Sequence, residues 1–133
     1  MERVKPKKFL GQHFLKDTEI AKRIVESLDT KKIKYFLEIG PGMGILTQYL
    51  LKLSIPGFFI EIDKDSVKYL NKHYPSISEK LILADFIKIN LHDFNSPIGI
   101  IGNFPYNISS QILFKVIENR QLIDQLVGMF QLE

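Results

Sequence analysis

The sequence feature that most constrains the fold is the segment Tyr35–Gly44, YFLEIGPGMG. Its first half is an apolar run that predicts a buried strand, and its second half has glycine at every second position, at Gly40, Gly42 and Gly44. Because glycine has no Cβ, these positions can turn sharply, adopt positive φ and let a bound molecule lie against the main chain. A helix predicted from Leu46 would add unpaired amide hydrogens at its amino end. The pattern predicts a strand, a ligand-binding loop and a helix.

The spacing of the glycines distinguishes between classes of ligand. The dinucleotide-binding fingerprint is G-x-G-x-x-G, whereas here the glycines alternate and position 45 is isoleucine. The form E-x-G-x-G-x-G, which begins at Glu38, is associated with S-adenosylmethionine (SAM). A tight strand-to-helix turn that binds no ligand is the alternative interpretation.

Hydrophobic periodicity along the rest of the chain predicts alternating helices and strands. Helices are predicted around Ile20, Ile24 and Leu28; Leu46, Tyr49, Leu50 and Leu53; Val67, Leu70 and Tyr74; and Ile112, Leu113, Val116 and Ile117. Strands are predicted at Gly57–Ile62, Leu81–Ala84, Ile98–Gly102 and Leu126–Phe130. Asp17 or Thr18 is expected to cap the first helix, and the second is expected to end before Pro56. The alternation indicates an α/β fold with a parallel sheet.

Two acidic residues near the ends of predicted strands are candidates for ligand contacts. Glu61 lies 17 residues after Gly44, about where a parallel neighbouring strand presents an acid to ribose hydroxyls. A carboxylate accepts two hydroxyl hydrogens at once, although a solvated acid at a strand end is the alternative. Asp85 follows the strand Leu81–Ala84, and ligands of doubly wound sheets bind at the carboxyl ends of the strands. Its carboxylate is suited to accept a hydrogen bond from the amino group of an adenine.

The segment Asn103-Phe104-Pro105-Tyr106 follows the predicted fourth strand and is a candidate catalytic motif. The exocyclic amine of adenine is a poor nucleophile because its lone pair is delocalised into the ring. The side-chain oxygen of Asn103 and a main-chain carbonyl would accept its two hydrogens and aim the lone pair at a methyl donor. Pro105 would stiffen the turn, and Tyr106 would stack on a base removed from its helix. Taken alone, a plain loop explains Asn-x-Pro-Tyr almost as well.

The length of 133 residues predicts one domain, which is short for a catalytic domain with its own substrate-recognition module. The chain has no cysteine, so disulfides and thiolate metal sites are excluded, and we expect no metal. No segment has the length of a signal-peptide core or a membrane span, so we expect a cytoplasmic protein without membrane contact.

Basic residues gather at the amino-terminal end of the chain. Residues 1–34 contain ten Lys or Arg against five Asp or Glu, whereas residues 35–133 contain eight against ten. The positive end is either an arm for phosphate backbones or a solvated basic tail.

Five motifs, in order along nearly the whole chain, resemble the ribosomal RNA adenine N6,N6-dimethyltransferases. They lie at Lys8–Leu15, Glu38–Gly44, Ile60–Asp63, Ala84–Asp85 and Gly102–Ser109. The similarity to the bacterial small-subunit group implies SAM-dependent dimethylation of adenine N6 on two adjacent adenosines near the 3′ end of 16S rRNA. Its implied partners are 16S rRNA and the immature 30S subunit. The implied fold is the Rossmann-like SAM-dependent methyltransferase fold, truncated after strand five.

The resemblance also implies roles for single residues. It places SAM contacts at His13, Leu15, Gly40, Glu61 (ribose) and Asp85 (cofactor adenine), with Asn103 beside the transferred methyl. Many members have asparagine at the position of His13. Gly42 and Gly44 complete the predicted cofactor loop, and Phe104, Pro105 and Tyr106 complete the predicted catalytic motif.

Members of this family continue through two more strands and a small helical domain that helps to bind RNA. The resemblance therefore implies that residues 1–133 are a SAM-binding catalytic domain without those parts, either a fragment or a shortened product. In the related strand order 3-2-1-4-5-7-6, Leu126–Phe130 would then be an exposed sheet edge. Two other hypotheses are the sister family that methylates 23S rRNA and confers antibiotic resistance, and a non-catalytic RNA- or ribosome-binding fragment.

Overall fold

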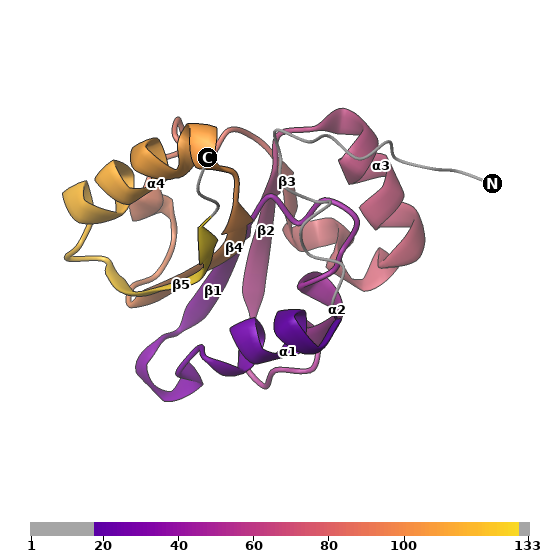
Figure 1. Ribbon diagram of the computed structural model, residues 1–133, viewed down its shortest axis with the longest axis horizontal. Coiled ribbons are helices and arrows are strands. Elements are labelled where there is room, and N and C mark those ends of the chain that lie inside the picture. Colours follow the sequence, from indigo (N-terminus) through magenta and orange to yellow (C-terminus); the bar gives the residue numbers. More distant parts are fainter. Residues whose placement is uncertain (1–17, 131–133) are drawn as a thin grey trace.

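The computed structural model describes residues 18–130, apart from the side chain of Tyr106. Helices and strands alternate along this part of the chain (Figure 1). The elements are α1 (Thr18–Glu26), η3 (Thr30–Lys32), β1 (Tyr35–Ile39), α2 (Thr47–Leu50), β2 (Gly57–Glu61), α3 (Lys64–His73), η4 (Pro75–Lys80), β3 (Leu81–Leu83), η5 (Leu91–Asp93), β4 (Ile98–Phe104), α4 (Tyr106–Glu118) and β5 (Ile123–Phe130), where η denotes a 3-10 helix. The predicted sequence of helices and strands is confirmed.

The five strands form one parallel sheet in the order β3-β2-β1-β4-β5. β1 lies in the centre, and four of its five residues are buried, as a strand covered on both faces requires. From β1 the chain adds β2 and β3 on one side and then crosses to add β4 and β5 on the other. Ligands of such sheets bind at this switch point, at the carboxyl ends of the strands.

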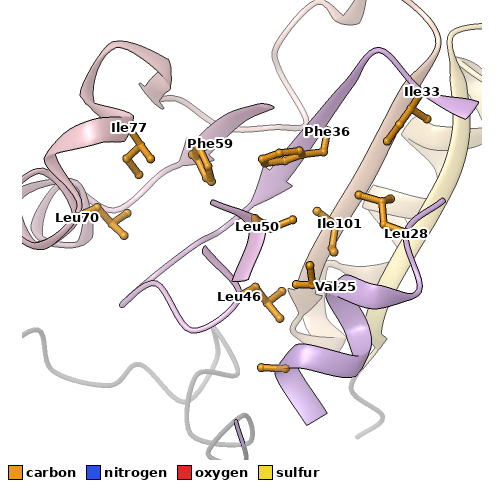
Figure 2. Packing of buried hydrophobic residues seen from close by; sticks show 11 residues of the cluster. Val25, Leu28, Ile33, Phe36, Leu46, Leu50, Phe59, Leu70, Ile77 and Ile101 are labelled. Carbon is orange, nitrogen blue, oxygen red and sulfur yellow. The ribbon is translucent and has the colours of Figure 1, made fainter. Parts of the chain in front are cut away.

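Successive residues of β1 point to opposite faces of the sheet and enter two separate cores. Phe36 belongs to the core that α1, α2 and α3 cover, together with Leu50 and Leu70 (Figure 2). Leu37 belongs to the core on the other face, together with Ile112 of α4. The sheet therefore lies between two helical layers, which fix the strand ends where the candidate site is found.

Two helices differ from their predictions. α2 has only four residues, because main-chain amides beyond it, including that of Leu53, bond three residues back in turns rather than four residues back. α4 begins already at Tyr106, because Pro105 occupies its N-cap with φ −67°, and proline favours the start of a helix. The catalytic motif, in which Pro105 was expected to stiffen a turn, therefore joins a strand directly to a helix.

β5 begins at Ile123 rather than Leu126, because its pairing with β4 starts at Ile98. Among the described residues no strand pairs with its outer side, so β5 is one of the two edges of the described sheet, as predicted. Asp17, one of the two expected caps of α1, lies outside the described residues.

The loop after β1 confirms the predicted backbone of the three glycines. Gly40, Gly42 and Gly44 have φ of 66°, 60° and 87°. Their amides donate to the Ile60 carbonyl, the Glu61 carboxylate and the Pro41 carbonyl, respectively. The amides of Gln48 and Tyr49 in α2 also donate to main-chain carbonyls. The expectation that amides at the amino end of this helix are left unpaired is therefore wrong for Gln48 and Tyr49.

Candidate functional site

A pocket of about 270 Å³ opens at the carboxyl ends of β1, β2, β3 and β4. It is lined by Ile39, Gly40, residues 60–62, residues 84–87, residues 103–105, and Asn107, Ile108, Gln111 and Ile112 of α4. Four strands and one helix, distant in sequence, thus meet at one cavity. Its position is the switch point of the sheet, where a ligand is expected.

Gly40 and Asn103 line the same pocket, from the ends of two neighbouring strands. Ile39, the last residue of β1, pairs with Gly102 of β4, so the residues that follow them, Gly40 in the loop and Asn103 in β4, come at the same end of the sheet. A Cβ placed on Gly40 would meet no atom within 4 Å. Because Gly40 also lines the pocket, a ligand there could approach its main chain without meeting a side chain.

Glu61 is a buried carboxylate that faces both the glycine loop and the pocket. Its side chain is only 2% exposed, which is contrary to a solvated acid at a strand end. Oε1 accepts the Gly42 amide at 2.8 Å, and Oε2 accepts the Asp63 amide at 2.9 Å. Burial raises the pKa of Glu61, while these backbone hydrogen bonds oppose the rise. A carboxylate has about four acceptor positions, so capacity for two hydroxyl hydrogens remains.

Glu38, the acidic residue that opens the glycine motif, is buried beneath the loop rather than in the pocket. It is 1% exposed and accepts a hydrogen bond of 2.5 Å from the Thr47 hydroxyl of α2. Burial, as the main cause, raises the pKa of Glu38 to about 8, against the lowering effect of the Thr47 hydrogen bond. Sequence reasoning gave Glu38 no role, although its place before the first glycine was a signal.

Asp85 lies half-buried in the turn after β3 and lines the pocket. Its Oδ1 accepts the amide of Ile87 at 3.0 Å, and its carbonyl accepts the amide of Lys88 at 2.9 Å. The turn therefore holds the Asp85 carboxyl group at the carboxyl ends of the strands, where the pocket opens. β3 pairs with β2 up to Glu61, which brings the two predicted acids to neighbouring strand ends.

The predicted catalytic motif is divided between β4 and α4. Asn103 is half-buried and lines the pocket. The Phe104 side chain is 1% exposed and packs in the core, 4.8 Å from the ring of Phe130 between centroids. The Pro105 carbonyl accepts hydrogen bonds from the amides of Ile108 and Ser109 and from the Ser109 hydroxyl. The side chain of Phe104 thus supports the site from within the core.

The structure brings six of the predicted site residues together in the pocket: Gly40, Glu61, Asp85, Asn103, Phe104 and Pro105. Gly42 and Gly44 do not line it. A Cβ on Gly44 would lie 2.4 Å from Tyr74 Cε2, so a side chain there would have to displace the Tyr74 ring. His13 and Leu15 lie outside the described residues, as does the side chain of Tyr106.

Sequence reasoning missed most of the apolar lining of the pocket. Ile62 follows Glu61, lines the pocket and is 58% exposed. Phe86 and Ile87 follow Asp85, and Ile108 enters from α4. The signal for Ile62, Phe86 and Ile87 was their position directly after Glu61 or Asp85, because residues that follow an acid at a strand end line the same cavity here.

Among residues 18–130, no group of three or more His, Cys, Asp or Glu side chains is arranged to hold a metal ion. No helix in this part of the chain has the length and apolar character needed to cross a membrane.

Comparison with known proteins assigns this chain to a family. Residues 3–133 match the family described as Ribosomal RNA adenine dimethylase. Ribosomal RNA small subunit methyltransferase A of Flavobacterium johnsoniae is 53% identical over 135 aligned positions, which cover 100% of this chain and 52% of that protein. The protein of the same name from Bacteroides thetaiotaomicron is 50% identical, with 100% and 51% covered. The chain thus spans about half the length of these relatives.

Solved structures of related enzymes share the fold. The 23S rRNA methyltransferase ErmE superposes with a TM-score of 0.72 at 27% identity, covering 85% of this chain and 46% of that one. A dimethyladenosine transferase from Plasmodium falciparum gives 0.67 at 32% identity, covering 87% and 41%. These likenesses confirm the predicted α/β, Rossmann-like fold of SAM-dependent methyltransferases. Together with the match over residues 3–133, they identify the chain as a member of the ribosomal RNA adenine dimethylase family.

Proposed function

We propose that this chain binds SAM in the pocket at the carboxyl ends of the strands and provides the catalytic part of a 16S rRNA adenine N6,N6-dimethyltransferase. The observation that carries the proposal is the open space at Gly40, where a Cβ would meet no atom within 4 Å. Gly40 lines a cavity that two strand-end carboxylates, Glu61 and Asp85, and Asn103 also line.

The described residues fit the parts of SAM one by one. Gly40 lets the ligand lie against main chain, because it lines the pocket and has open space where a side chain would stand. Glu61 keeps acceptor capacity for the two ribose hydroxyls, and its two backbone hydrogen bonds fix the carboxylate plane. Asp85 faces an apolar lining that includes Ile62 and Ile87, which is suited to an adenine ring. We further assign His13 and Leu15 to the cofactor site by the family resemblance.

Transfer requires the target amine to be held in line with the methyl donor. When bound, SAM supplies the methyl group from its sulfonium centre. The Asn103 side-chain oxygen accepts one hydrogen of adenine N6. We assign the second acceptor to the Phe104 carbonyl, because the Pro105 carbonyl already accepts three hydrogen bonds from α4. Catalysis then comes from positioning and hydrogen bonding. Tyr106 would stack on the target base.

The proposed substrate is 16S rRNA in the immature 30S subunit, and the proposed place of action is the cytoplasm. Relatives about 50% identical over the whole of this chain are named for the small ribosomal subunit, which favours this substrate over 23S rRNA. The excess of basic residues in positions 1–34 supplies charge for phosphate contacts. We propose that residues 1–133 form a SAM-binding catalytic domain. We also propose that RNA binding and turnover need further domains, and the relatives, about twice as long as this chain, are long enough to contain them.

A chimeric enzyme tests this function. Residues 1–133 replace the matching half of the Flavobacterium johnsoniae relative, and the chimera is assayed on 30S subunits that lack the adenine methylation. We expect N6-dimethylation of two adjacent adenosines near the 3′ end of 16S rRNA. In the Asn103→Ala chimera we expect SAM binding to persist and transfer to be lost.

The assay also separates the competing functions. Methylation of 23S rRNA in place of 16S rRNA would indicate the resistance-type activity, for which the likeness to ErmE is the specific observation. A folded chimera that binds 30S subunits without any transfer would indicate a non-catalytic RNA-binding module. Turnover of Asn103→Ala within a few-fold of the unsubstituted chimera would remove Asn103 from the mechanism.

A further inference from the structure

We propose that Lys115 is a positioning residue that ties α4 to the turn carrying Asp85 and thereby sets the width of the cofactor pocket. This inference rests on the proposed SAM site. Lys115 lies in α4 and does not line that pocket itself. It therefore acts through the segments it holds and not by contact with the ligand.

The Lys115 ammonium makes three hydrogen bonds to main-chain carbonyls of one short segment. Its Nζ donates to the Phe86 carbonyl at 2.5 Å, to the Ile87 carbonyl at 3.0 Å and to the Ile89 carbonyl. An ammonium group has three donors, so this segment uses all of them. The same Nζ lies 5.1 Å from the centre of the Phe86 ring, within cation–π range.

Because Lys115 is buried, its ammonium group would be strongly destabilising without these hydrogen bonds. Lys115 is only 8% exposed, and a buried charge without partners is strongly unfavourable. Desolvation, as the largest cause, lowers the pKa of Lys115, while the charges of Asp85 and Glu118 oppose that shift. A lysine used only for solubility would extend into water. Here the side chain runs inward and ends on carbonyls of the turn.

Both segments that Lys115 joins contribute to the pocket. Phe86 and Ile87 line it directly, and the Ile87 amide holds Oδ1 of Asp85. On the helix side, Gln111 and Ile112 line the pocket one turn before Lys115. The ammonium therefore fixes the distance between the turn and α4. Loss of its three bonds frees the turn that orients Asp85, while the sheet and both cores keep their contacts.

The absence of cysteine from the chain allows a clean test with chemical rescue. Lys115→Met removes the ammonium but keeps the apolar stem. Lys115→Cys is alkylated with 2-bromoethylamine in denaturant and then refolded. The thiolate displaces bromide, a carbon–sulfur bond forms, the thiol proton passes to the buffer, and the product is a lysine analogue with sulfur in place of Cγ. The parent chain is put through the same treatment, and Lys68, exposed on α3, gives the matched controls Lys68→Met and Lys68→Cys.

Two measurements are made on each protein: SAM affinity by calorimetry, and amide hydrogen exchange of residues 86–89 without ligand. We expect Lys115→Met to remain folded, to bind SAM on the order of tenfold more weakly, and to exchange faster in this segment. We expect aminoethylated Lys115→Cys to recover both properties, and the Lys68 variants to match the parent. Should Lys115→Met fail to fold, Lys115→Gln takes its place in both measurements.

Unchanged SAM affinity in a folded Lys115→Met or Lys115→Gln variant would overturn the inference. So would a refolded aminoethylated protein that stays as weak as the methionine variant. Failure of the parent itself to bind SAM would contradict the proposed function and this inference with it. Unchanged SAM affinity in the Lys115 variants of a parent that does bind SAM overturns only this inference and leaves the proposed function intact, so the two failures are distinguishable.

Discussion

At the scale of single residues, Gly40 and Glu61 show how one backbone gap and one buried acid prepare a ligand site. Gly40 combines a positive φ with open space where a side chain would stand. Glu61 holds the adjacent loop through the Gly42 amide. The open space at Gly40 leaves room for a ligand, and the hydrogen bonds of Glu61 hold the main chain at Gly42 and Asp63.

The first prediction concerns Gly40. Gly40→Val should abolish SAM binding, because its side chain would fill the pocket and valine tolerates φ of 66° poorly. Gly40→Asn separates the two effects, since asparagine adopts positive φ more readily. We expect both variants to lose SAM binding in calorimetry, with Gly40→Asn keeping more of the parent stability. Parent-like affinity in a folded Gly40→Asn protein would contradict the assignment of the site.

The second prediction concerns Glu38, whose pKa burial raises from 4.5 to about 8. Below about pH 4.5 the carboxyl is protonated in both folded and unfolded chains, and its contribution to stability is fully present. As the pH rises toward 8, the unfolded chain releases this proton first, so stability is lost. The loss has an upper bound of about 5 kcal/mol.

We expect urea unfolding to show this decline between pH 5 and pH 8 in the parent and a much smaller one in Glu38→Gln. The amide of glutamine keeps an acceptor for the Thr47 hydroxyl. Glu79→Gln, at an exposed position of η4, is the matched control and should follow the parent. Parallel profiles of stability against pH for the parent and Glu38→Gln would show that ionisation of Glu38 does not contribute to the pH dependence of stability in this range.

At the scale of elements, strong periodicity was sufficient for prediction and weak periodicity was not. β1 and its glycine loop, β2 and the helix α3 lie where their patterns place them. α2 was predicted too long, because Leu46, Tyr49, Leu50 and Leu53 keep their apolar face in turns as well as in a helix. The start of β5 at Ile123 was missed because its pairing with β4 decides it.

The candidate site was predictable only in part for a similar physical reason. Acidic residues at strand ends and glycines in the loop after a strand can be recognised from their place in the sequence pattern, so Glu61, Asp85 and Gly40 were predicted. The carbonyls that Lys115 binds and the apolar lining at Ile62 depend on which segments meet in space. A single sequence does not contain that information as a local pattern.

The third prediction concerns the basic segment of residues 1–34. Replacing Lys5, Lys7 and Lys8 with Gln should flatten the salt dependence of binding to a fragment of 16S rRNA. Each lost phosphate contact should reduce the logarithmic slope by roughly 0.7 to 0.9. Gln at Lys52, Lys64 and Lys68, which are exposed on the body of the protein, should leave the slope unchanged. Equal slopes for the two triple variants would return the basic segment to a solvated tail.

At the scale of the whole molecule, the strands of the described sheet differ in burial. The central strand β1 is buried between the two cores, whereas β5 is buried less completely. Seven of the eight residues of β5 are not fully buried. Within the described residues, its outer side has no partner strand. An apolar edge of this kind is a template for pairing with another chain.

The fourth prediction is that this chain self-associates at micromolar concentration through β5. Leu126–Phe130 contains no charged residue that would discourage pairing. Met129→Lys should reduce association, whereas Leu51→Lys, at an exposed position of the α2 C-cap, should not. Sedimentation velocity measures both. A stable monomer in the parent would show that the edge of β5 is protected.

The central claim is that the strand-end pocket binds SAM, and a calorimetric titration of the 133-residue chain tests it most directly. SAM and NAD are titrated in parallel, because the glycine spacing separates the two ligand classes. We predict saturable, weak binding of SAM, abolished by Gly40→Asn, and no binding of NAD. Absence of SAM binding by a folded parent chain, or SAM binding that Gly40→Asn leaves unchanged, would contradict the account.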